Sequence, residues 1–211
     1  KAFYVIIPDN TPCTLYADLE WGLNWKTEEE IKNKFLEIVQ ETLTAAGYHS
    51  DEDDFLFASA SQAETNKGSM HVHAPSIVFN NVNEQQKFFN SVRATLYKQT
   101  EWYFVDETNK NYMIKTFIDF GVYNKNRQMR LPYSGKLKNG KIVRPLIPEN
   151  EEEFDIADWV IIDMSDFEGN PVNVQDLQGT EFRPKKEHWN KELLQGLCDA
   201  KQLDVSIDSL R

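Results

Sequence analysis

The chain has 211 residues, of which 40% are hydrophobic and 12% aromatic, and its formal net charge is -11. This length and composition are typical of a folded globular protein and exclude a disordered chain. The negative charge argues against a protein that coats nucleic acid without specificity, because affinity for phosphate comes mainly from Lys and Arg.

The first elements in chain order are two strands and a helix. Segments 2–8 and 14–21 are rich in β-branched and aromatic residues, which predicts strands. Thr27 and Glu30 form a capping box, and apolar residues at helical spacing follow it. A helix is therefore expected over 28–46.

The remainder of the chain continues as mixed strands and helices. Strands are expected over 55–60 and 69–79, and a helix over 84–99 with Asn83 as its N-cap. The last expected elements are strands around Tyr103 and over 112–120, and helices over 155–164 and 186–200. The strands do not alternate simply with helices, so the pattern indicates an α+β fold rather than a parallel βαβ sheet.

Cysteines and apolar runs bear on the class of protein. Cys13 and Cys198 lie near opposite ends of the chain and form no CxxC pair, so neither a disulfide framework nor a zinc ribbon is expected. This cysteine usage favours a reducing, intracellular setting. No run of about 18 apolar residues occurs, so no membrane span is expected. The chain begins with Lys1 and not with Met, and we expect it to be a piece of a longer protein.

Asp18 and Glu20 are the first candidate site residues. Side chains alternate along a strand, so both carboxylates project from the same face of an otherwise apolar segment. Two adjacent anions repel each other unless a divalent cation neutralises them, which suits Mg²⁺ or Mn²⁺. The alternative is a strand with one solvated polar face, because a D-x-E tripeptide is common.

The second candidate stretch runs from Lys67 to His73. Lys67, Ser69, His71 and His73 share one face of a strand that starts early enough. A cation with several hydrogen-bond donors can bind a triphosphate. Two alternatives stay open, namely an HxH site for a transition metal and two histidines that are simply on the surface.

The third candidate stretch is an apolar run that ends at Asp119 and leads into a basic segment. Between residues 109 and 144, nine Lys and Arg stand against this one acid, so a local basic surface is expected. A buried Asp needs a partner or a metal. Asp119 could complete the cluster of Asp18 and Glu20, with Arg130 and Lys136 reaching phosphate oxygens. The alternative is a solvated basic loop with Asp119 in a structural salt bridge.

Together the three stretches resemble the archaeo-eukaryotic primase superfamily, and within it the PrimPol branch, which also includes herpesvirus-type and large-DNA-virus primases. That family has D-x-E, S-x-H and an apolar run ending in Asp, in this order. The third motif is the most specific, because the match continues from Asp119 through D-F-G-V-Y, K-N-R and R-L to Lys136. The resemblance covers about residues 15–136.

The resemblance implies a two-lobed α+β catalytic core with its active site between the lobes. It implies an N-terminal α/β module over about 1–100, an RRM-like module with a mixed or antiparallel sheet over 101–150, and a helical part over 151–211. The implied activity is that of a template-dependent nucleotidyltransferase, either a DNA primase or a primase-polymerase. Two Mg²⁺ or Mn²⁺ ions would be held by the acids Asp18, Glu20 and Asp119. The incoming triphosphate would be bound by Lys67, Ser69, His71, Arg130 and Lys136.

The same resemblance implies partners and a place of action. The partners are a single-stranded DNA template with its primer, NTP or dNTP substrates, and a helicase domain or subunit, at the site of DNA replication in the cell. We further expect contacts to the nucleic-acid backbone from Lys125, Arg127 and Lys138. Tyr123 and Tyr133 either stack on a base or belong to the core.

Departures from the family pattern leave two other functions open. The Cys/His zinc module that follows the PrimPol core is absent, so no zinc is expected in this segment, and the priming accessories are expected elsewhere or not at all. One alternative is a metal-dependent nuclease or phosphoesterase with His71 and His73 as extra ligands. The other is a catalytically inactive, primase-like binding scaffold.

Overall fold

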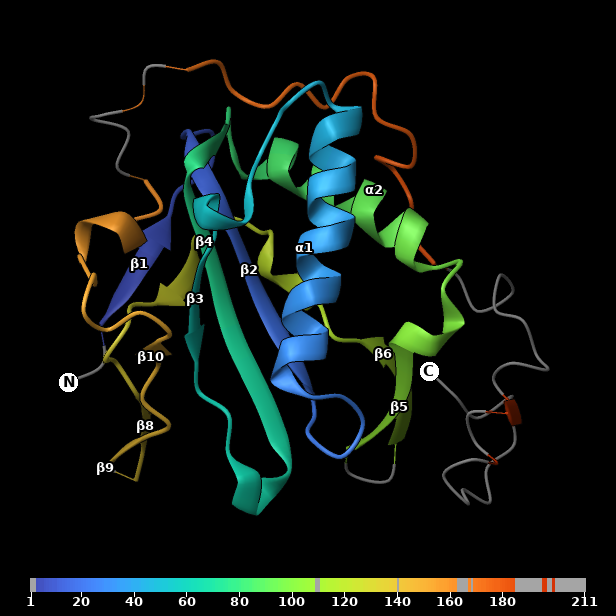
Figure 1. Cartoon of the computed structure of the whole chain (residues 1–211), viewed down its shortest axis with the longest axis vertical. Helices are drawn as coiled ribbons and strands as arrows, with labels where there is room; N and C mark the ends of the chain where they lie inside the picture. The colour runs from blue at the N-terminus through green and yellow to red at the C-terminus, as the bar shows by residue number, and fades with distance from the viewer. Residues whose placement is uncertain are drawn as a thin grey trace.

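The computed structural model describes residues 3–108, 111–139, 141–162, 167, 169–184, 195–196 and 199, without the side chains of 105–113, 137, 138 and 142. Its centre is a four-stranded antiparallel sheet in the order β10-β3-β4-β2 (Figure 1). These strands are β2 (Cys13–Gly22), β3 (Leu56–Ser59), β4 (Lys67–Phe79) and β10 (Ile147–Pro148). The observed mixture of antiparallel strands and few helices confirms the α+β class.

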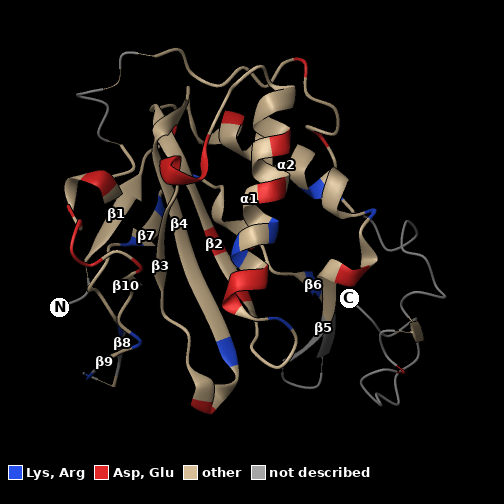
Figure 2. Ribbon diagram, viewed as in Figure 1, with Lys and Arg blue, Asp and Glu red and all other residues tan. Residues whose placement is uncertain are grey.

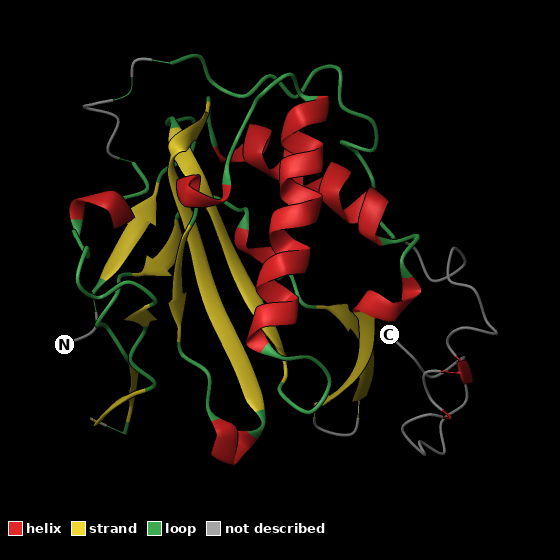
Figure 3. Cartoon of the chain, viewed as in Figure 1, coloured by secondary structure: helices red, strands yellow, loops and turns green. Residues whose placement is uncertain are grey.

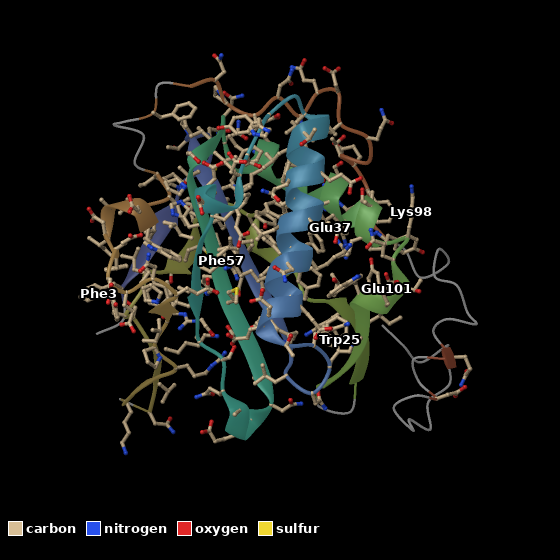
Figure 4. All side chains as sticks on the ribbon, viewed as in Figure 1. Phe3, Trp25, Glu37, Phe57, Lys98 and Glu101 are labelled. Carbon is tan, nitrogen blue, oxygen red and sulfur yellow. The ribbon has the colours of Figure 1, made fainter. Side chains whose placement is uncertain are left out.

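Helices α1 (Glu28–Ala45) and α2 (Val82–Leu96) lie over one face of this sheet (Figure 3). The predicted capping box of α1 is confirmed, because the Thr27 side chain accepts a hydrogen bond from the Glu30 amide and Glu30 accepts one from the Thr27 amide. Phe35 of α1 packs edge-on against Phe57 of β3, with ring centroids 6.5 Å apart (Figure 4 labels Phe57). Full burial of such a ring contributes about 1.5–3 kcal/mol, so this face forms the main core.

Three two-stranded antiparallel sheets complete the described strands. They are β1 (Tyr4–Ile7) with β7 (Arg127–Arg130), β5 (Tyr103–Thr108) with β6 (Asn111–Thr116), and β8 (Lys136–Lys138) with β9 (Lys141–Val143). The short 3₁₀ turns are η1 (Glu52–Asp54), η2 (Ala63–Thr65), η3 (Thr100–Trp102), η4 (Phe120–Val122) and η5 (Ala157–Trp159). The basic segment, for which the sequence indicated only turns, thus supplies strands that pair with the N-terminal strand and with each other.

Several predicted boundaries are wrong. Helix α2 begins at Val82, and its N-cap is Asn81, whose side chain accepts from the Asn83 and Glu84 amides. Val82 is buried, so the packing of α2 draws the helix start two residues earlier than the polar pattern indicated. The strand expected over 112–120 ends at Thr116.

The helix expected over 155–164 is also wrong in its described part, which holds only the 3₁₀ turn η5. Trp159 is instead buried in a small cluster with Ala58, Ala60 and Leu146. The Ile161 carbonyl accepts a hydrogen bond from the Thr14 amide at 2.8 Å, so its hydrogen bond goes to the sheet and not to a helix. The helix expected over 186–200 falls almost entirely outside the described residues. Neither α1 nor α2, the long helices among the described residues, has the length and apolar content to cross a membrane.

Candidate functional site

The pairing of β2 with β4 sets the first two motifs directly opposite each other. Asp18 lies across from His71, and Glu20 lies across from Ser69. Lys67 pairs with Gly22 at the end of the same ladder. Residues that alternate along one strand share a face, so the polar side chains of both motifs project from one face of the sheet.

The third motif lies along the other edge of β2. Leu19 and Ile118 form an antiparallel bridge. The Asp119 amide donates to the Asp18 carbonyl at 2.9 Å, and the Glu20 amide donates to the Phe117 carbonyl at 2.8 Å. The structure therefore brings Asp18, Glu20 and Asp119 together at neighbouring backbone positions, although a hundred residues of chain separate the first from the last.

Asp18 is the most perturbed of these acids. Its side chain is 16% exposed, and its Oδ1 is buried without a hydrogen-bond partner among the described residues. Burial, followed by the neighbouring charges of Glu20 and Asp119, raises the pKa of Asp18 from 3.8 to about 7. Lys136 and Arg130 act in the opposite direction. A buried carboxylate with an unused oxygen is a natural ligand for a cation.

Glu20 and Asp119 have other partners in this structure. Glu20 forms an ion pair with Lys67, whose Nζ donates a hydrogen bond to Glu20 Oε1 at 2.7 Å. Asp119 Oδ1 accepts a hydrogen bond from the Gly121 amide at 2.8 Å and so caps η4, and its Oδ2 lies 4.0 Å from Arg127 Nη2. Asp119 is only half-buried, which corrects the expectation of a buried acid.

The two histidines of β4 lie in different surroundings. His71 is buried with its Nε2 3.8 Å from Asp18 Oδ1, and burial followed by the charges of Arg130 and Lys136 lowers its pKa to about 3. His73 is hydrogen-bonded to the Thr14 hydroxyl and lies against the Trp159 ring, and burial lowers its pKa to about 4. Both imidazoles are therefore neutral near pH 7, and only His71 lies beside an acid of the site.

Two basic residues of the third motif lie beside the acids. Arg130 is buried at the end of β7, and the opposing charges of Asp18 and Glu20 act on it. Burial and then the charge of Arg130 lower the pKa of Lys136, while Glu20 raises it. Figure 2 shows acidic residues on β2 with basic residues on β7 and β8. The face thus combines a compact set of acids with a rim of cations.

The described donor set fits a divalent cation in its chemistry but is not yet gathered around one. Three carboxylates on adjacent backbone positions, one with a buried unpartnered oxygen, are the oxygen ligands that Mg²⁺ and Mn²⁺ prefer. Among the described residues, however, no three His, Cys, Asp or Glu side chains lie close enough together to hold a metal ion. Glu20 is instead paired with Lys67, and Asp119 Oδ1 accepts a hydrogen bond from the Gly121 amide.

The residues predicted to contact nucleic acid are placed in different ways. Lys125 Nζ lies 3.7 Å from Asp9 Oδ2 on the protein surface, and Arg127 faces Asp119. The side chain of Lys138 lies outside the described part. Tyr123 is buried and stacks on Phe89 at 4.3 Å, so of its two alternatives the structure supports a place in the core and not base stacking. Tyr133 is 47% exposed.

Two residues that support the site escaped the sequence pattern. Gly68 pairs with Trp21, and a Cβ at Gly68 would lie 2.1 Å from Trp21 Cε2, so only glycine lets this indole lie across β4 on the face opposite to Glu20 and Ser69. Arg144 accepts a hydrogen bond from Arg130 through its backbone carbonyl. A glycine inside a strand pattern is a recognisable signal, whereas Arg144 was one cation among many.

Comparison with known proteins gives one weak relationship. The chain matches no protein-family model. It is 26% identical over 192 residues to "Uncharacterized protein ORF49" of Ostreid herpesvirus 1 (isolate France). This match covers 85% of the chain and 16% of that protein, so the chain spans about a sixth of the length of its relative.

Proposed function

We propose that this chain is the catalytic core of a template-dependent nucleotidyltransferase, a primase or primase-polymerase of the archaeo-eukaryotic class. The observation that carries the proposal is the convergence of three sequence motifs on one face of the sheet, with Asp18 opposite His71 and the Asp119 amide bonded to the Asp18 carbonyl. Motifs that are weak singly gain weight when the fold places them side by side. The two-lobed architecture with an RRM-like second module is part of this proposal.

The cations beside the acids support a triphosphate site. Lys67, Arg130 and Lys136 supply positive charge that would offset the charge of the phosphates as it builds up in the transition state. Ser69 and His71 supply directional donors from β4. His71 is neutral with a pKa of about 3, which makes it a poor general base near pH 7 and favours its role as a hydrogen-bond donor.

The acids would hold the metal ions that this chemistry uses. Bound Mg²⁺ or Mn²⁺ lowers the pKa of an attacking 3'-hydroxyl and stabilises a departing pyrophosphate. Asp18 is the anchor of this set, because its Oδ1 is buried and unpartnered in the part of the chain that the structure describes. Glu20 and Asp119 would join it by leaving Lys67 and the Gly121 amide.

The proposed partners are a single-stranded DNA template with its primer, NTP or dNTP, and a helicase domain or subunit, at a site of DNA replication. The relative from a herpesvirus is consistent with a viral replication protein, although its description assigns it no activity. It also extends far beyond the matched region, as a protein that carries such a core together with other domains would.

Incorporation of labelled nucleotide on a single-stranded template tests the proposal. The assay is run with and without an annealed primer, in Mg²⁺ and in Mn²⁺, with Asp18→Ala and Asp119→Ala as matched inactive variants and Glu41→Gln on the exposed face of α1 as the control. We expect extension by the wild type and by the control, and none by the two Asp variants. Products without primer identify a primase, and products only with primer identify a polymerase core.

Two results would contradict the proposal. Shortening of the DNA without added nucleotide would instead support the nuclease alternative. His73→Ala should then reduce the rate of shortening, because only the nuclease alternative uses His73 as a metal ligand. A folded wild type that neither extends nor shortens DNA would support the binding scaffold.

A further inference from the structure

Arg144 lies at the start of the turn between β9 and β10, outside the three motifs, yet its backbone reaches the site. Arg130 Nη1 donates a hydrogen bond to the Arg144 carbonyl at 2.9 Å. Within the described residues, this is the one hydrogen bond that the Arg130 side chain makes. A guanidinium has five N–H donors in a fixed fork, so one anchored nitrogen sets the direction of the whole group.

The backbone of Arg144 adopts a conformation that a side chain disfavours. Its φ is 53°, in the left-handed region, where four of the other five described non-glycine residues with positive φ are asparagines. A residue such as Arg in this region costs about 1 kcal/mol or more and persists only where its surroundings compensate for it. The hydrogen bonds of the Arg144 side chain compensate for this backbone cost.

The guanidinium of Arg144 holds the Ala60 carbonyl with two hydrogen bonds. Its Nε lies 3.2 Å and its Nη2 3.1 Å from the Ala60 oxygen. The Ala60 amide in turn donates to the Ser69 carbonyl at 2.8 Å. Arg144 therefore connects Arg130 on β7 with Ser69 on β4, two residues of the proposed triphosphate site that come from distant parts of the chain.

We propose that Arg144 is a positioning residue for the proposed triphosphate site: its side chain anchors on Ala60 so that its carbonyl fixes the guanidinium of Arg130 toward the acids. This inference rests on the proposed function. Arg144 acts through Arg130, and its own positive charge is also close enough to act on Arg130 and Lys136. The group bound is the polyphosphate of a nucleoside triphosphate.

Binding of inorganic tripolyphosphate, measured by titration calorimetry on the full chain, tests the inference without turnover. Arg144→Ala keeps the carbonyl but removes the anchor, and we expect the affinity to fall about tenfold, the size that a hydrogen bond to a charged group supplies. Arg144→Lys keeps the positive charge but loses the forked guanidinium, so the affinity of this variant for tripolyphosphate should fall by a similar factor. Lys141→Ala removes an exposed charge from the neighbouring strand and should bind as the wild type does.

A double-mutant cycle separates positioning from independent contact. If Arg144 acts through Arg130, the affinity of Arg130→Ala should not fall further when Arg144→Ala is added. Additive losses of tripolyphosphate affinity in the double variant would overturn the inference. An unchanged affinity of Arg144→Ala, or a wild-type affinity of Arg144→Lys, would also overturn it. Thermal unfolding of each variant confirms that it is folded, and Arg144→Gly, which relieves the positive φ, replaces Arg144→Ala if that variant unfolds.

The inference and the proposed function fail in different ways. A wild type that binds tripolyphosphate and extends primers, with an Arg144→Ala variant that does both equally well, removes Arg144 from the site and leaves the function standing. A folded wild type that does neither refutes the proposed function and, with it, the role of Arg144.

Discussion

Replacing Asp18 with Asn should make the metal-free protein more stable at pH 8. The pKa of Asp18 is raised from 3.8 to about 7, mainly by burial. This difference of about 3 units, at 1.36 kcal/mol per unit, means that ionising the buried carboxyl costs up to roughly 4 kcal/mol. The Asn amide leaves its own polar atoms to satisfy, at about 1–3 kcal/mol, so we expect a net gain of about 1–3 kcal/mol in the free energy of unfolding.

The gain should depend on pH with a defined sign. Because the folded pKa of Asp18 lies above the unfolded value, its contribution to stability is fully present below pH 3.8 and is lost as pH rises through about 7. The advantage of Asp18→Asn should therefore grow between pH 5 and pH 7 and be constant above it. Glu41→Gln, on the exposed face of α1, should change stability by less than about 0.5 kcal/mol at every pH.

Urea unfolding followed by tryptophan fluorescence, in the presence of a chelator, measures these differences. Mn²⁺ at 100 times its dissociation constant should then stabilise the wild type by about 2.7 kcal/mol and leave Asp18→Asn unchanged. A variant that is less stable than the wild type by the same amount at pH 5 and pH 8 would refute the reasoning, because the carboxylate would then be satisfied in the fold.

Three further predictions concern residues of β4. Gly68→Ala should destabilise the protein by about 1–3 kcal/mol in urea unfolding, because the new Cβ would meet Trp21 Cε2 at 2.1 Å. Gly196→Ala serves as the control, because a Cβ at Gly196 meets no atom of the described residues within 4 Å. The pKa of His73 is lowered to about 4, so its contribution to stability is present above about pH 6.5 and is lost as pH falls toward 4. In the Asp18→Asn background, His73→Gln should therefore flatten the fall in stability between pH 6.5 and pH 5. An unchanged slope of stability against pH would contradict this prediction. Lys67→Ala should change stability by less than about 1 kcal/mol, because the ion pair of Lys67 with Glu20 is more than a third exposed. The same variant should weaken tripolyphosphate binding. A large loss of stability with normal binding would assign Lys67 a structural role.

The sequence alone indicated most of the elements that carry the site. The capping box at Thr27 and the apolar repeat behind it are local signals, and they located α1 within a residue of its observed end. The apolar strands around D-x-E and S-x-H were found because strand periodicity is also local. These local signals failed where contacts distant in the sequence determine the structure. Burial of Val82 moves the start of α2 two residues earlier, and burial of Trp159 accompanies a single 3₁₀ turn in place of the predicted helix.

The register between strands is what only the tertiary structure decided. No local pattern states that Asp18 faces His71 or that the Asp119 amide reaches the Asp18 carbonyl, because both contacts depend on pairing across long stretches of chain. The tertiary contacts also showed that Asp119 is a half-exposed cap, that Tyr123 belongs to the core, and that the Arg144 carbonyl accepts a hydrogen bond from Arg130. Sequence determined which chemical groups are present on each strand. Burial and register, which depend on the whole chain, decided which of those groups meet and at what pKa.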